Sequence, residues 1–289
     1  MDFLAFLLTQ CVNALSQAAL LFFLGVGLTL IFGIMRIVNF AHGSIYMLGA
    51  FVGYSAAWLT GSFWVALVVS PIVVGLFGTA FELSILRRLY RRDGSAFLMV
   101  TFGLALILGE VVRLLWGSEA LQVQGPAEFS GVVFILDEPF PVYRLFLAAA
   151  GVAVALAIWQ FLERTRLGLL IRATSQIAEM VHALGTDVNL VRSSVFGIGC
   201  GLAAFGGVLA APLVTASLGM AASVIIDSFV IVIIGGMGSF PGSLIGALLV
   251  AFVQVFGNYY FPDLALAFMY LIMLLVLVVR PGGLLGKEA

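Results

Sequence analysis

Residues 10–34 read QCVNALSQAALLFFLGVGLTLIFGI, a segment without one Asp, Glu, Lys or Arg side chain. A helix needs about 20 consecutive apolar residues to cross the hydrocarbon core of a bilayer. This segment is therefore predicted to be a membrane-spanning helix. The residues before it contain Asp2 and no basic cluster, so we interpret them as a short lead into the helix, with no sign of a cleaved signal peptide.

The composition of the whole chain leads to the same class. Of the 289 residues, 63% are hydrophobic and only 9% are charged, whereas about 25% are charged in an ordinary soluble domain. So little charge cannot cover a water-facing surface, but a bilayer takes the place of that polar shell. We therefore predict an all-α polytopic membrane protein, with residues 1–289 as a single domain. The net charge of −1 gives no reason to expect nucleic acid.

Nine segments are predicted to cross or enter the membrane. Three of them, 43–60, 224–238 and 242–258, are short and rich in glycine, which is typical of half-helices or tilted pieces. We therefore expect about 8–10 membrane helices, with short and broken ones included. The remaining segments are 10–34, 63–86, 95–116, 140–162, 192–216 and 263–280.

Basic residues are divided unevenly between the two sides of this arrangement. Of the thirteen Lys and Arg residues, only Arg113 and Arg144 lie on one predicted side of the membrane. Because Lys and Arg are retained in cytoplasmic loops, the opposite side is predicted to be cytoplasmic, with the N-terminus outside and the C-terminus inside. An odd number of crossings follows. The predicted cytoplasmic residues are Arg36, Arg87, Arg88, Arg91, Arg92, Arg164, Arg166, Arg172, Arg192, Arg280 and Lys287.

Two polar segments are long enough to have a role of their own. Residues 117–139 are predicted to form an outer loop, and residues 163–191 an inner loop. Within the inner loop, residues 174–184 are predicted to form a short helix that stops at a glycine. Its apolar residues recur at helical spacing and would make one face. We expect this face either to dock onto a partner or to fold back on the membrane domain. The candidate coupling residues are Arg172, Ile177, Glu179, Val181, Leu184 and Gly185.

A faint internal repeat marks two broken segments. FAHGS at 40–44 opens the second predicted span, FPGS at 240–243 opens the eighth, and each follows a glycine-interrupted apolar segment. Corresponding broken segments in two halves of a membrane protein point to a transport pathway. Asn39 could equally serve as a cap for the following helix. The candidate pathway residues are Asn39, His42, Gly43, Ser44, Gly235, Gly236, Gly238, Pro241 and Gly242.

Four ionisable residues fall within the predicted spans, where an unpaired charge is costly. Glu82 lies near the inner end of its span, where it could extend toward the membrane surface or pair with the arginines that follow. Glu110 and Arg113 are spaced to neutralise each other. Asp227 is expected at the N-terminal end of the seventh span, where the helix dipole favours a carboxylate. These residues form no chain of acids through the membrane centre, which argues against an ion-coupled carrier.

Motifs for catalysis are missing from the sequence. No Gly-x-x-x-x-Gly-Lys-Ser/Thr phosphate loop occurs, and the nearest stretch, GLLGK at 283–287, has the wrong spacing. The two histidines are isolated, and Cys11 and Cys200 are far apart, so neither residue type indicates a metal site. We therefore predict no ATPase site in this chain, no cofactor and no intramembrane protease.

Residues 27–43, GLTLIFGIMRIVNFAHG, resemble the opening signature of the branched-chain amino acid ABC permeases, and more narrowly the first of the two permease types in that system. Two further groups of residues agree with this family over nearly the whole length. The cytoplasmic loop contains RTRLG at 164–168, IRA at 171–173 and ALG at 183–185. The C-terminal part contains IGGMGSFPGS at 234–243 and RPGGL at 280–284.

This resemblance implies a permease subunit of a multi-pass ABC importer in the bacterial inner membrane. Its expected partners are a second permease, two cytoplasmic ATPase subunits, a solute-binding protein outside and membrane lipid. ATP would drive alternating access for a small polar solute, with a branched-chain or related amino acid favoured. Two alternatives remain open from the residues: a channel or secondary carrier that acts without an ATPase, and a sugar-type ABC permease.

Overall fold

The computed structural model describes residues 3–90, 94–135 and 138–286. The predicted cytoplasmic residues Arg91, Arg92 and Lys287 lie outside this described part. Within it, one helix corresponds to each of the nine predicted membrane segments. These helices are α1 (Phe3–Met35), α2 (His42–Thr60), α3 (Phe63–Phe81), α5 (Gly94–Trp116), α6 (Val142–Arg164), α8 (Val188–Val214), α9 (Met220–Gly235), α10 (Phe240–Tyr260) and α11 (Ala265–Val279).

Seven helical stretches in the described residues are long and apolar enough to cross a membrane. α2 is not among them, and α9 has only 16 residues. The prediction of an all-α polytopic membrane protein with short segments is confirmed. The glycine-rich segments 43–60 and 224–238 are the ones that fall below the requirement. The expectation that 242–258 is also short is wrong, because α10 has 21 residues and is one of the seven.

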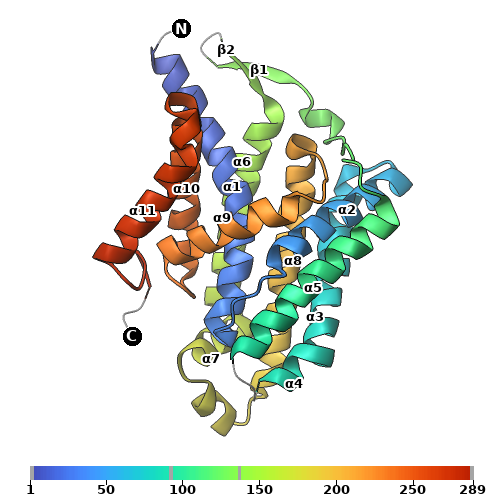
Figure 1. Cartoon of the computed structure of the whole chain (residues 1–289), viewed down its shortest axis with the longest axis vertical. Coiled ribbons are helices and arrows are strands. Elements are labelled where there is room, and N and C mark those ends of the chain that lie inside the picture. Colours follow the sequence, from blue (N-terminus) through green and yellow to red (C-terminus); the bar gives the residue numbers. More distant parts are fainter. Residues whose placement is uncertain (1–2, 91–93, 136–137, 287–289) are drawn as a thin grey trace.

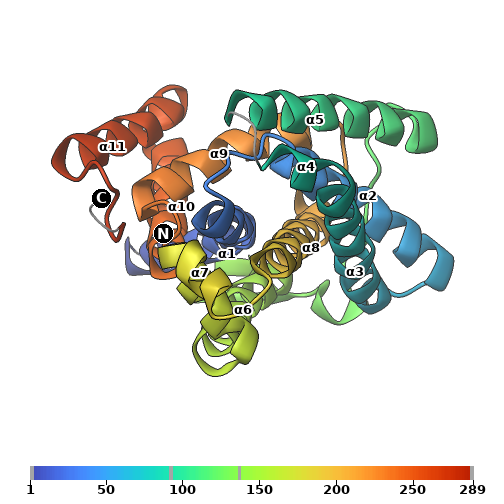
Figure 2. The same cartoon turned by 90° about the horizontal axis from the view of Figure 1, so that it is seen from below.

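α1 is the central helix of the bundle. It packs against α6, α8, α9 and α10, which enclose it in the end-on view of Figure 2. The largest fully buried side chains on α1, Phe22 and Phe23, form edge-on contacts with Phe240 and Phe205 on neighbouring helices. α9 crosses the outside of α1 obliquely (Figure 1).

Small residues allow the other helices to approach closely. A Cβ atom on Gly49 of α2 would lie 2.3 Å from Cα of Ala204 on α8, and one on Gly53 would lie 2.6 Å from a methyl group of Val208. Ser70 of α3 donates a hydrogen bond of 2.7 Å to the Gly49 carbonyl. Without a hydrophobic driving force between helices in lipid, close backbone packing of this kind holds a membrane bundle together.

The predicted outer loop contains more regular structure than the sequence indicated. Strands β1 (Val132–Ile135) and β2 (Glu138–Pro141) form an antiparallel hairpin with Val132 opposite Pro141, after a short 3₁₀ turn, η2 (Ala127–Phe129). Both strands of a two-stranded hairpin are edge strands, so Pro139 and Pro141 can be accommodated in β2.

The hairpin and the beginning of α1 lie at one end of the molecule, and the segments α4 (Arg87–Leu89) and α7 (Arg166–Ala183) lie at the other (Figure 1). α4 and α7, which belong to segments predicted to share the cytoplasmic side, therefore lie at the same end. Which end faces the cytoplasm remains a prediction from the basic residues.

Candidate functional site

The first predicted pathway segment joins α1 to α2 and is packed inside the chain. Asn39 is buried, and its side-chain oxygen accepts a hydrogen bond of 3.1 Å from the Ala41 backbone N–H at the start of α2. His42 is also buried, with Nε2 at 3.0 Å from the Leu24 carbonyl of α1. The other polar side-chain atoms of both residues, Nδ2 of Asn39 and Nδ1 of His42, are buried without a hydrogen-bond partner among the described residues.

The next two residues of this segment contact other helices. A Cβ atom on Gly43 would lie 2.3 Å from the Ala221 carbonyl oxygen of α9, so only glycine permits this approach. The Ser44 hydroxyl donates a hydrogen bond of 3.3 Å to the Ala105 carbonyl of α5. The rings of Phe40 and Phe229 meet edge-on at 5.4 Å. The first segment is therefore fixed against α9.

The second predicted pathway segment is the turn between α9 and α10. Gly236 and Gly238 adopt positive φ angles of 104° and 82°, which a residue with a side chain rarely adopts. The Ser239 side chain accepts a hydrogen bond of 3.2 Å from the Gly242 N–H and caps α10. Pro241 is the second residue of α10, where its missing N–H breaks no helical hydrogen bond.

The chain end closes this turn in a way that sequence reasoning missed. Backbone N–H groups of Leu284 and Leu285 donate to the carbonyls of Ile234 and Gly235, at 2.8 and 3.0 Å. These bonds satisfy carbonyls at the C-terminal end of α9 that would otherwise lack partners. Gly283 approaches so closely that a Cβ there would lie 2.5 Å from Gly236. The glycines at 282, 283 and 286 were the only feature of the sequence that could have indicated this close approach.

α9 connects the two predicted segments. Gly43 packs against its first half, and the glycine turn begins at its last residue. The end of α1 also reaches the turn, because a Cβ on Gly33 would lie 3.2 Å from Cα of Gly238. The two segments therefore share α9 and α1 as neighbours. Both segments are tightly packed in this conformation.

The expected position of Asp227 is wrong. α9 begins at Met220, so Asp227 lies two turns inside the helix and not at its N-terminal end. The predicted segment began at residue 224, because Ala221, Ala222 and Ser223 are only weakly hydrophobic or polar. The first turn of α9 was therefore missed. The Asp227 carboxylate accepts a hydrogen bond of 3.2 Å from the side-chain amide of Gln254 on α10.

Glu82 also differs from expectation, whereas the pair on α5 is confirmed. Glu82 lies in a π-helical turn, η1 (Glu82–Leu86), is fully buried, and accepts hydrogen bonds from the hydroxyls of Tyr90 and Ser193. None of the described arginines forms an ion pair with it. The hydrogen bond from Ser193 of α8 joins residues that are far apart in the chain, so a local sequence pattern cannot predict it. Arg113 and Glu110 form the expected ion pair, at 2.6 Å.

The predicted inner helix is longer than expected and is bent. α7 starts at Arg166, and the backbone at Ile177 leaves the helical region, with φ −141° and ψ 84°. The single apolar face is therefore not formed: Val181 is 7% exposed, whereas Ile177 and Leu184 are 56% and 81% exposed. Gly185 ends the segment with a φ of 86°.

The charged candidates on α7 have different surroundings. Arg172 forms an ion pair of 2.5 Å with Glu163 at the end of α6. Glu179 is exposed and forms no ion pair with another described residue. α7 itself packs against α6, α8 and α1. The helix is thus anchored to the membrane bundle by one side, and its exposed side retains Ile177, Met180 and Leu184.

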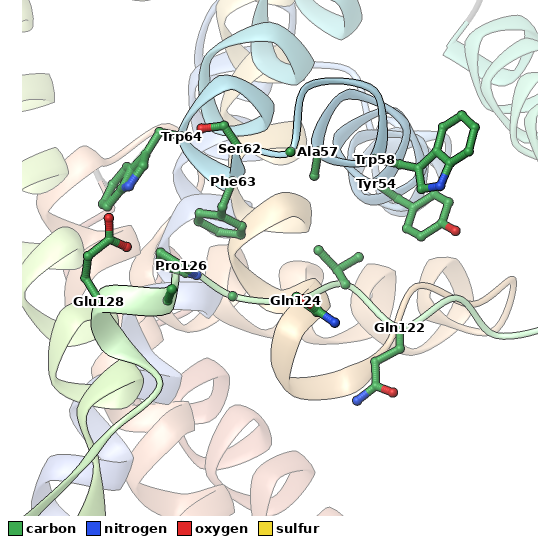
Figure 3. A pocket seen from close by; sticks show the side chains of 14 residues that line it. Tyr54, Ala57, Trp58, Ser62, Phe63, Trp64, Gln122, Gln124, Pro126 and Glu128 are labelled. Carbon is green, nitrogen blue, oxygen red and sulfur yellow. The ribbon is translucent and has the colours of Figure 1, made fainter.

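Two pockets open at opposite ends of the molecule. The larger, of about 520 Å³, lies between the α2–α3 turn and the outer loop (Figure 3). Trp58, Tyr54 and Gln122 lie at one end of it, and Trp64 and Glu128 at the other. The smaller, of about 360 Å³, lies between the end of α1, the bend of α7 and Arg192 of α8.

Apolar helices packed around a buried central helix, together with a short helix that ends in a glycine-broken turn, define a polytopic α-helical membrane protein. Comparison with known proteins gives its family. The chain belongs to the family described as "Branched-chain amino acid transport system / permease component", whose model matches residues 10–277. It is a multi-pass protein of the bacterial inner membrane.

Three relatives illustrate the similarity. The high-affinity branched-chain amino acid transport system permease protein BraD of Pseudomonas aeruginosa is 29% identical over 97% of this chain and 96% of its own length. LivH of Escherichia coli K12, a protein of the same description, is 25% identical over 98% and 96%. The probable branched-chain amino acid transport permease protein LivH of Methanocaldococcus jannaschii is 27% identical over 96% and 91%.

A solved structure also resembles the chain weakly. It is PsaBC from Streptococcus pneumoniae in complex with Fab, with a TM-score of 0.47 and 14% identity over 92% of this chain and 89% of that chain. A likeness at this level carries no argument about function.

Proposed function

We propose that this chain is the membrane permease subunit of an ATP-driven importer for branched-chain amino acids. The observation that carries the proposal is the relationship to BraD and LivH, which extends over nearly the whole of each chain. The relatives are named as permeases of branched-chain amino acid transport systems. The missing phosphate loop is consistent with this role, because ATP hydrolysis then belongs to separate subunits.

The proposed assembly contains a second permease, two cytoplasmic ATPase subunits and an external solute-binding protein. In this assembly the N-terminus is outside and the C-terminus inside, and residues 163–191 face the ATPase. The exposed side chains of Ile177, Met180 and Leu184 support the last point, because each would bury apolar surface when a partner covers this end of the bundle.

The proposed solute pathway follows α9, at the interface with the second permease. It is lined by the segments 39–44 and 235–242 when the importer changes between outward-open and inward-open forms. Both segments are tightly packed here, so a path requires α9 to move relative to α1 and α2. The positive φ angles of Gly236 and Gly238 at the end of α9 support such a movement, because glycine can change its backbone conformation more freely than other residues.

The test is ATP-dependent uptake by the complex that purifies with an affinity tag on this chain. The complex is reconstituted in proteoliposomes with its solute-binding protein, and uptake of radiolabelled L-leucine is measured with and without ATP on the cytoplasmic side. The proposal requires uptake only with ATP and an ATPase subunit in the purified complex. Uptake driven by an ion gradient or by the solute gradient alone, without ATP, would show a carrier or a channel.

A further inference from the structure

Asp227 is a carboxylate in the middle of an apolar helix. α9 reads MAASVIIDSFVIVIIG, and Asp227 has two helical turns on each side of it. An ionisable side chain this far inside a membrane helix is costly when it faces lipid, so it normally faces protein, water or a transported solute. The Asp227 carboxylate therefore needs a partner that neutralises its charge.

The chain itself supplies one neutral partner. The Gln254 side-chain amide of α10 donates to Oδ1 of Asp227 at 3.2 Å, and the same nitrogen lies 3.4 Å from the sulfur of Met269 on α11. Among the described residues, no Lys, Arg or His forms an ion pair with Asp227. Its second oxygen, Oδ2, and the amide oxygen of Gln254 accept no hydrogen bond from them. The negative charge is hydrogen-bonded but not compensated.

The pair lies at the accessible outer side of the bundle. Asp227 and Gln254 are both half-buried. α9 lies outside α1, with α11 on one side and α5 on the other (Figure 2). The preceding turn of α9 packs against Gly43, and the turn at its end is the second predicted pathway segment. Asp227 therefore lies on the helix that joins the two segments.

We propose that Asp227 and Gln254 form a contact site for the cationic nitrogen of the transported solute. The inference rests on the proposed function, because an amino acid carries an ammonium group. An ammonium has N–H donors for the open oxygens of both side chains and supplies the missing positive charge. A neutral or anionic solute would leave the carboxylate uncompensated at a place where water is scarce.

The experiment compares variants in the reconstituted complex with its binding protein and ATP. Asp227→Asn removes the charge and is expected to lower L-leucine uptake at least tenfold, with the same yield of complex and the same thermal stability. Asp227→Glu restores the charge with a longer side chain, so its uptake should recover in part, with a raised KM. Asp263→Asn, which changes an exposed carboxylate of the turn η3 (Pro262–Leu264), is the matched control and should behave as the wild type.

Gln254→Leu gives an independent measurement, because it keeps the carboxylate and removes the amide. It should raise the KM for L-leucine without loss of the complex. Unchanged KM and uptake in Asp227→Asn overturn the site and leave the proposed function intact. An Asp227→Asn chain that no longer retains the second permease also overturns it, because the carboxylate then pairs with that subunit. A wild-type complex that does not import L-leucine overturns the proposed function and the site together.

Discussion

Replacing Gly236 with alanine should destabilise the turn after α9 in two ways: through backbone strain and through overlap with packed atoms. The residue has a φ of 104°, and such a conformation costs a residue with a Cβ about 1–3 kcal/mol. The added Cβ would also lie 2.3 Å from the backbone nitrogen of Gly286 and 2.6 Å from its Cα. Overlap with packed atoms typically costs about 1–3 kcal/mol more. We expect Gly236→Ala to lower the free energy of unfolding by about 2–6 kcal/mol in total.

Gly117→Ala is the matched control for this prediction. Gly117 also has a positive φ, 85°, but a Cβ there meets nothing within 4 Å, so only the conformational cost of about 1–3 kcal/mol applies. The free energy of unfolding of the purified chain in detergent, measured with denaturant, should fall more for Gly236→Ala than for Gly117→Ala. An equal loss in both variants would show that the C-terminal turn does not pack against Gly236 as described.

Three further predictions concern orientation, pathway and coupling. A single cysteine introduced by Ser175→Cys should resist an impermeant thiol reagent added to intact cells, and labelling from outside would reverse the proposed orientation. Gly43→Leu should abolish L-leucine uptake, because the side chain collides with the Ala221 carbonyl; normal uptake would remove this segment from the pathway. Ile177→Asp and Leu184→Asp should release the ATPase subunits while the bundle still folds, whereas Val181→Asp should lower the yield of the chain itself, since Val181 is buried. Normal ATPase binding by both exposed variants would contradict docking through α7.

The membrane helices could be predicted because their signal is local. An apolar run of sufficient length must be buried in lipid or protein wherever it lies in the chain, so nine segments could be placed from composition and length alone. The glycine turn at 235–242 was also visible, because glycine and proline interrupt the run. These features depend on neighbouring residues and need no knowledge of the tertiary structure.

The features that could not be predicted depend on contacts between distant residues. Glu82 accepts a hydrogen bond from Ser193, 111 residues away. The carbonyls of Ile234 and Gly235 are satisfied by residues 284 and 285, after α10 and α11 have intervened in the chain. The bend at Ile177 breaks the helical spacing on which the single apolar face of α7 was based. The functional roles of the candidate residues remain predictions.

The central position of α1 has a consequence for how the protein is made. α1 ends at Met35, whereas the helices that enclose it are synthesised later, and the last of them, α10, begins at Phe240. α1 must therefore enter the bilayer as a lone helix, surrounded by acyl chains, and exchange them for protein contacts as each neighbour arrives. Its apolar sequence makes α1 stable in lipid before its neighbours are inserted, because lipid tails solvate it as well as leucine side chains do. A ribosome that stops before α10 leaves one flank of the central helix without its protein neighbour, so release of an intact bundle requires synthesis of nearly the whole chain.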